Sequence, residues 1–267
     1  MRLPNAPLVE VVFELHWDVQ LTSVAGESPP FGYDPALHYF RETFKKAAAE
    51  RGFSEYERFI QPGPTILSTI DSRFRRQKRE PFPLLQIGPG VVACNLATDY
   101  EWDDFHKLCS LLLELLEETY PQTEVTPLNP NRIELRYIDH FGEGVIKSKS
   151  ISKFLDDQTN LGSAIHQLLD GLPLQSDDSG HLAVRKEASE MPGSWFEFNI
   201  RTATSGGKQS GIGMVSKVVL EQGVDHIWRS GGREGILEWL SGAHNLTSAF
   251  FKRIMSDELM DAFREGQ

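Results

Sequence analysis

The sequence predicts an α+β fold made of two sheet-and-helix halves. Alternating apolar and polar residues indicate several strands, and apolar residues spaced three or four apart indicate longer helices. The elements up to residue 144 follow the order β-α-β-β-β-α-β, which is loosely ferredoxin-like. The rest of the chain has the pattern of an antiparallel meander packed by a long C-terminal helix. We therefore expect one half over residues 1–144 and a second over 145–267.

The N-terminal half begins with a strand over 8–18, where apolar residues at odd positions alternate with polar ones. Asp34 and Pro35 then have the residue types of a helix N-cap and first helical position. The helix that they start should end at Gly52, because glycine takes the left-handed conformation that terminates helices.

Two strand-like stretches come next, at 65–74 and 83–97. Gly88-Pro89-Gly90 divides the second of these, so a hairpin is expected there.

Thr98 and Glu101 have the spacing of a capping box, which predicts a helix over 99–119. Pro121 should stop that helix. Alternation returns at 131–141 and predicts the last strand of this half.

Residues 142–150 are polar and rich in Gly, Lys and Ser, as is typical of a linker between the halves. Three strands and a long helix dominate the C-terminal half. The predicted strands lie at about 181–189, 195–203 and 212–222, and the predicted helices at 151–157, 161–169, 233–255 and 257–264.

Composition limits the function classes. The 267 residues are 40% apolar and 24% charged, which is ordinary globular usage. The formal charge of −11 disfavours general binding to nucleic acid, because phosphate contacts come from lysine and arginine. Because no stretch has the pattern of an export signal or of a membrane span, we expect neither export nor membrane insertion. With only Cys94 and Cys109 available for disulfides, a reducing cytoplasm is the expected location.

Three segments together resemble a known protein family. They are PLVEVVFEL near the N-terminus, QIGPG followed by YEW in the centre, and RIELRYID. Together with the C-terminal helix around His244, they are similar to a sporadically distributed bacterial family of about 250–270 residues that has no assigned function. The resemblance implies no catalytic residues. The family's patchy distribution suggests an antitoxin-like or defence-associated component.

Candidate catalytic residues are few. Asp103, His106 and Cys109 recur every three positions on the predicted 99–119 helix, a spacing that a metal could use. The helix N-terminus already explains Asp103, and a cysteine among leucines is typical of a core, so neither metal nor cofactor is expected. Asp139 and His140 end a strand but point to opposite faces, which separates them for catalysis.

One dense basic run lies beside a predicted strand. Its cations could contact phosphates, with Phe74 stacking on a base, although charge runs usually mean only exposure. The cations are Arg73, Arg75, Arg76, Lys78 and Arg79.

The C-terminal helix has an apolar surface wider than a single packing face needs. Phe250 belongs to its regularly spaced apolar seam, and Leu237, Leu246 and Phe251 widen the surface beyond that seam. Phe251 points about 100° away from Phe250 around the helix. We therefore expect Leu237, Phe250 and Phe251 to contact a protein partner, and we expect a homodimer through this helix.

The sequence thus favours a non-enzymatic binding or regulatory protein that acts through protein contacts. Two alternatives stay open. One is a hydrolase or nuclease whose site assembles only in three dimensions. The other is a nucleic-acid-binding protein that uses the 73–79 run.

Overall fold

The computed structural model describes residues 7–19, 35–59, 69–97, 100–122, 127–142, 144–147, 150–162, 181–205 and 208–264. The strands are β1 (Leu8–Trp17), β2 (Glu55–Arg58), β3 (Ser72–Arg75), β4 (Leu84–Gly88), β5 (Val91–Leu96), β6 (Pro130–Gly142), β7 (His181–Glu187), β8 (Ser194–Ser205) and β9 (Lys208–Leu220). The helices are α1 (Pro35–Glu50), α2 (Trp102–Thr119), α3 (Ile151–Gln158), α5 (Val224–Ile254) and α6 (Asp257–Arg264).

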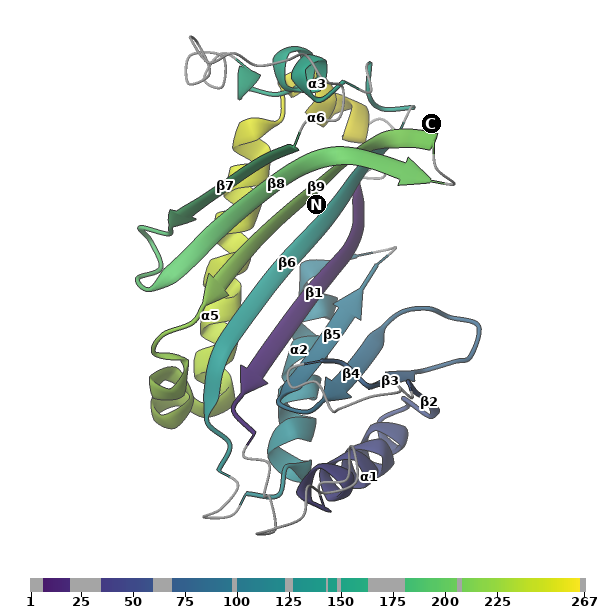
Figure 1. Ribbon diagram of the computed structural model, residues 1–267, viewed down its shortest axis with the longest axis vertical. Helices are drawn as coiled ribbons and strands as arrows, with labels where there is room; N and C mark the ends of the chain where they lie inside the picture. The colour runs from purple at the N-terminus through teal and green to yellow at the C-terminus, as the bar shows by residue number, and fades with distance from the viewer. Residues whose placement is uncertain are drawn as a thin grey trace, which may run out of the picture. The chain divides into compact units, whose positions relative to one another are not determined.

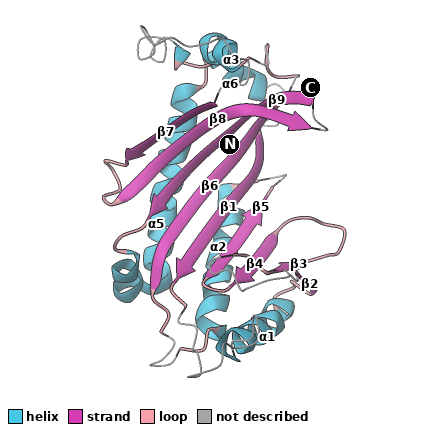
Figure 2. Ribbon diagram, in the orientation of Figure 1, coloured by secondary structure: helices cyan, strands magenta, loops and turns pink. Residues whose placement is uncertain are grey.

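The described strands form one antiparallel sheet in the order β2-β3-β4-β5-β1-β6-β9-β8-β7 (Figures 1 and 2). The predicted α+β class and the predicted meander of the last three strands are therefore confirmed. Within the described residues, no helix combines the length and apolarity needed to cross a membrane.

The chain forms two compact units, each assembled from distant parts of the sequence. One unit combines residues 1–11, 136–218 and 241–267, and the other combines 12–135 and 219–240. The division into halves at residue 144 stays a prediction.

Aromatic packing organises the 12–135 and 219–240 unit. The Trp17 ring meets the rings of Phe40 and Tyr120 edge-on, at centroid distances of 6.1 and 5.4 Å. Phe74 on β3 packs against Phe44 on α1, with centroids 5.2 Å apart. These contacts agree with the predicted alternation, which places Trp17 on the apolar face of β1.

Two glycines act as predicted in this unit. Gly52 has a φ of +87° and lies just after α1, while the Phe53 amide donates to the Ala48 carbonyl at 2.9 Å, a Schellman-type end. Gly90, with a φ of +77°, completes the two-residue turn between β4 and β5. The predicted helix end and hairpin are thus confirmed.

The start of α2 differs from the prediction. The helix begins at Trp102, with Glu101 as its N-cap and no side-chain hydrogen bond at the cap. The predicted start at 99 was three residues too early, and the proposed cap residue Thr98, like Asp34, lies outside the described residues. The helix ends before Pro121, as expected.

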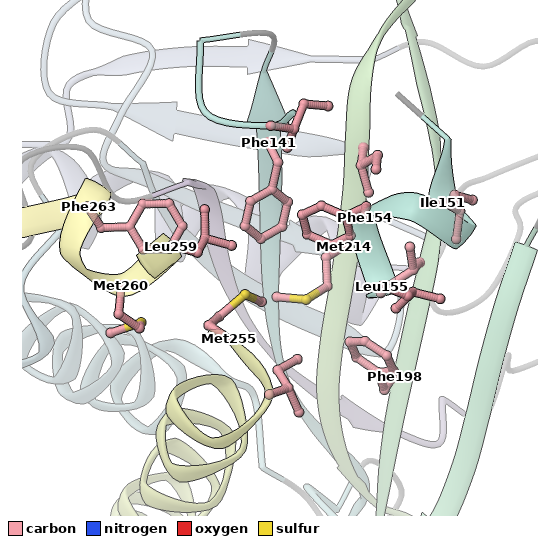
Figure 3. Packing of buried hydrophobic residues seen from close by; sticks show 14 residues of the cluster. Phe141, Ile151, Phe154, Leu155, Phe198, Met214, Met255, Leu259, Met260 and Phe263 are labelled. Carbon is pink, nitrogen blue, oxygen red and sulfur yellow. The ribbon is translucent and has the colours of Figure 1, made fainter. Parts of the chain in front are cut away.

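The 1–11, 136–218 and 241–267 unit encloses a second apolar core (Figure 3). Phe141 of β6 contacts Phe154 of α3 and Phe263 of α6, at centroid distances of 5.1 and 6.2 Å. Ile146, within the predicted linker, belongs to the same core. α6 matches its predicted span, while the second predicted short helix, 161–169, lies mostly outside the described residues.

The long helix α5 contains a break at Gly232, where φ is 55° and ψ is −141°. The predicted helix from 233 is correct, but the helical segment from Val224 up to the break was not predicted. Gly231-Gly232 favours such a break because glycine tolerates a positive φ.

Candidate functional site

β7 is the most exposed strand of the meander and ends the sheet (Figure 1). Six of its seven residues are exposed, and only Leu182 is partly buried. The side chain of Val184 is 48% exposed, which is high for an apolar residue in a strand. Within the described part of the chain, β7 has a strand neighbour on one side only, which is β8.

The register with β8 shows which backbone groups face outward. β7 runs antiparallel to β8, with Val184 opposite Phe198. Next to the strand, the Ala188 amide donates to the Ser194 carbonyl at 2.8 Å, in the same register. Because backbone groups alternate sides along an antiparallel strand, Leu182, Val184 and Lys186 also direct theirs toward β8. The groups of His181, Ala183, Arg185 and Glu187 therefore point away from the sheet.

Side chains on one face hold β7 against its neighbours. The Arg185 guanidinium lies 4.8 Å from the centroid of the Trp195 ring and 3.3 Å from the Glu197 carboxylate. Lys217 on β9 pairs with the same carboxylate at 2.8 Å. His181 and Asn199 share a hydrogen bond of 2.8 Å. This polar ladder links three strands and keeps the exposed edge extended.

The opposite end of the sheet is a weaker candidate. β2 has only four residues, a length that limits strand pairing. Its Glu57 carboxylate lies 3.1 Å from Arg75 and 3.7 Å from Arg73. β2 was not predicted, because its sequence lacks an apolar alternation.

The residues predicted to bind a partner have neighbours within the molecule. Leu237 is buried at 6% exposure. Phe250 packs between the rings of β8, with centroid distances of 4.5 Å to Phe196 and 5.0 Å to Phe198. Phe251 is partly buried, and its ring lies 6.2 Å from that of Phe263. Their role in partner binding stays a prediction, and their observed contacts stabilise the core.

The basic run divides into paired and exposed cations. Arg73 and Arg75 pair with Glu57, and the Arg73 guanidinium lies 4.1 Å from the Phe59 ring. The proposal that Phe74 stacks on a base is wrong, because this side chain is fully buried between α1 and β2.

The remaining cations of the run are exposed. Arg76 lies 5.3 Å from the Phe53 ring, and Lys78 and Arg79 come after it on the surface. These three are the part of the run that a phosphate could reach.

The side chains of Asp103, His106 and Cys109 on α2 do not gather into a metal site. Cys109 is fully buried and its sulfur lies 3.4 Å from that of Cys94 on β5. Asp103 is exposed, and His106 lies beside Trp102 with ring centroids 5.5 Å apart. Among the described residues, no three His, Cys, Asp or Glu side chains gather as metal ligands.

A partly buried polar pair was not predicted from the sequence. Tyr137 on β6 and His244 on α5 share a hydrogen bond of 2.7 Å between the hydroxyl and Nδ1. Burial, with a smaller effect from Lys252, lowers the pKa of His244 to about 4. The sequence signal for this pair was a histidine, His244, among the apolar residues of the predicted 233–255 helix.

Asp139 lies on the same face of β6 as Tyr137, by strand alternation. Its side chain is buried, and burial raises its pKa to about 7. His140 is only partly buried and belongs to the other face, as expected. The side chains of Asp139 and His140 therefore lie on opposite faces of the sheet.

Charged residues on β1 and β6 pair within their own strands. His16 Nε2 lies 3.0 Å from the Glu14 carboxylate, and the Arg132 guanidinium donates to the Glu134 carboxylate at 2.6 Å. Glu134 is buried at 3% exposure. β1 and β6 are neighbours in the sheet, and each carries one such pair of charged residues.

Comparison with known proteins identifies no relative: the chain matches no protein-family model, no curated protein and no solved structure.

Proposed function

We propose that this chain is a binding protein that acts through protein contacts, and that the contact is made by β7. An extended segment of the partner adds to the edge of this strand and extends the sheet. Strand addition supplies affinity through main-chain hydrogen bonds, and side chains on the two faces supply specificity. The proposal keeps the non-enzymatic function that the sequence favours.

One observation carries the proposal. The outward backbone groups of Ala183 lie on a strand in which six of seven residues are exposed. Among the described strands only β8 pairs with β7, and a sheet edge of this kind is a template for another strand unless it is blocked. β2 is blocked by its shortness, whereas β7 spans seven residues.

Proline at position 183 tests the proposal. Proline has no N–H, and at residue 183 it would remove an outward donor without breaking a hydrogen bond to β8. Wild type, Ala183→Pro and the control Ala183→Ser serve as baits in lysate from the native cell. Each captured protein is then purified and its affinity for the three baits is measured by calorimetry.

The expected result is one protein that binds wild type and Ala183→Ser equally and binds Ala183→Pro at least tenfold more weakly. Circular dichroism should show that Ala183→Pro remains folded. A captured protein that binds all three baits with equal affinity would contradict the proposal.

A further inference from the structure

We infer that Cys94 and Cys109 form a redox pair: when the chain folds under oxidising conditions, their thiols join in an internal disulfide that ties α2 to β5. The closed fold then preserves the state in which it was made, dithiol or disulfide. Both cysteines lie in the unit of residues 12–135 and 219–240. The inference concerns this unit alone and does not depend on strand addition at β7.

The two sulfurs are in direct contact. Sγ of Cys94 lies 3.4 Å from Sγ of Cys109, although the two residues are 15 positions apart in the sequence. A disulfide bond is about 2.0 Å long, so the sulfurs would need to approach by about 1.4 Å, or about 0.7 Å each. Rotation of the two side chains can supply a shift of this size, so α2 and β5 can keep their positions.

The sheet and the helix fix the backbones that carry the two thiols. Cys94 lies within β5, where it pairs with Leu85 of β4. Cys109 lies near the middle of α2, and Phe105 and Leu112, about one turn away on either side, are fully buried. The fold therefore holds each thiol beside the other, which favours their reaction over reaction with a thiol from solution.

Oxidised glutathione is a sufficient oxidant, and the exchange balances. While the chain is still open, the thiolate of one cysteine attacks the disulfide of oxidised glutathione, forms a mixed disulfide and releases one glutathione thiolate, which takes up a proton. The thiolate of the second cysteine then attacks the cysteine sulfur of that mixed disulfide. The bond between Cys94 and Cys109 forms, and the second glutathione leaves. The chain has given up two protons and two electrons, and the electrons have reduced the glutathione disulfide.

Burial makes the closed fold resistant to the same exchange. Both cysteines are 0% exposed, so a glutathione molecule does not reach either sulfur while α2 covers β5. Burial also raises the pKa of the Cys109 thiol, which leaves little thiolate to react. The exchange therefore takes place before α2 closes on β5. A disulfide made at that stage is afterwards shielded from reductants, as the thiols are shielded from oxidants.

Refolding in two redox buffers tests the inference. Wild type is unfolded and reduced in guanidinium, freed of reductant, and refolded in either reduced or oxidised glutathione. Mass spectrometry of the intact chain and of its peptides identifies the bond, and near-ultraviolet circular dichroism compares the two folds. Urea denaturation compares their stability. The main comparison is between two redox states of one sequence, and a variant with both Cys94→Ala and Cys109→Ala is the control.

We expect the wild type refolded in oxidised glutathione to have the native spectrum, a mass lower by two hydrogen atoms and a peptide that links Cys94 to Cys109. Because the bond closes a loop between residues 15 positions apart, it should lower the unfolding equilibrium constant by on the order of a hundredfold. The control variant should have the same stability from both buffers. Reduced glutathione should open the disulfide of the folded chain at least tenfold more slowly than that of the chain in guanidinium.

Two results would overturn the redox pair. One is a chain that carries glutathione on its cysteines in place of the internal bond, and the other is an internal bond that forms only with loss of the native spectrum. Equally fast reduction of the folded and unfolded disulfide forms would overturn the protection by burial.

Discussion

The hydroxyl of Tyr137 on β6 lies 2.7 Å from Nδ1 of His244 on α5, where a sheet face meets the helix that covers it. The same face of β6 carries Asp139, whose pKa burial raises to about 7. The pKa of His244 is instead lowered to about 4. Buried Asp139 and partly buried His244, in one unit, thus have pKa values shifted in opposite directions.

These shifts make opposite contributions to the pH dependence of stability. The folded state holds the Asp139 proton that the unfolded chain loses above about pH 4, so this contribution to stability falls as the pH rises toward 7. Below about pH 6.5 the unfolded chain binds a proton at His244, whereas the folded state binds it only below about pH 4. The contribution of His244 to stability therefore falls as the pH is lowered. Between about pH 4 and 6.5 the pH dependences of these two contributions have opposite signs and offset each other.

Asp139→Asn should therefore change the pH profile. Relative to wild type, its free energy of unfolding should rise between pH 4 and 7, by on the order of 4 kcal/mol at most. Urea denaturation at pH 4, 5.5 and 7 measures this difference. A constant difference across these pH values would contradict a buried, protonated Asp139.

His244→Asn should show the opposite trend. Asparagine keeps an acceptor for Tyr137 but does not titrate, so relative to wild type the variant should gain stability as the pH falls from about 6.5 to 4. The same urea series measures it. Loss of stability at acid pH, compared with wild type, would show that His244 is not the responsible group.

Local sequence patterns predicted most elements of this fold, because burial on one face leaves a periodic signal. Trp17 and Phe74 illustrate this, since each lies on the buried side of its strand. β2 left no such signal. Its Glu57 is held by Arg73 and Arg75 from the next strand, so pairing rather than alternation defines it.

The candidate interface could not be predicted in the same way. Alternation indicates the β7 strand, but strand order, which makes β7 an edge, depends on contacts across the whole sheet. The broad apolar surface of α5 pointed instead to Phe251 as a partner contact. In the structure Phe263 of α6 lies against that side chain, so part of the extra width is used within the chain.

Phe263 should anchor α6 to its unit. The side chain is fully buried between Phe141 and Phe251. Phe263→Ala should lower the free energy of unfolding by about 3–5 kcal/mol, because it leaves a cavity in the core. The neighbouring exposed Arg264→Ala should cost less than about 0.5 kcal/mol. Urea denaturation of both variants measures the contrast, and equal losses would contradict this packing.

The exposed end of the basic run should matter little for folding. Arg76, Lys78 and Arg79 changed together to Ser should shift the free energy of unfolding by less than about 1 kcal/mol, since exposed charges contribute little. Thermal melting measures that shift. Fluorescence anisotropy with labelled DNA and RNA at physiological salt is the companion measurement. If the wild type binds DNA or RNA and this variant does not, the result would favour the nucleic-acid alternative over strand addition.

The two native thiols should be unreactive until the chain unfolds. Cys94 and Cys109 are fully buried with their sulfurs 3.4 Å apart, and burial raises the pKa of the Cys109 thiol well above its usual value. Only the thiolate reacts, so a disulfide reagent should find almost no reactive thiol in the native wild type. In guanidinium it should find two per chain. Val184→Cys should add one fast-reacting thiol under native conditions, because that position is 48% exposed. Absorbance of the released reagent at pH 8 measures the reactive thiols of the native wild type, the unfolded wild type and native Val184→Cys. Rapid reaction of the native wild type would contradict the packing of α2 on β5.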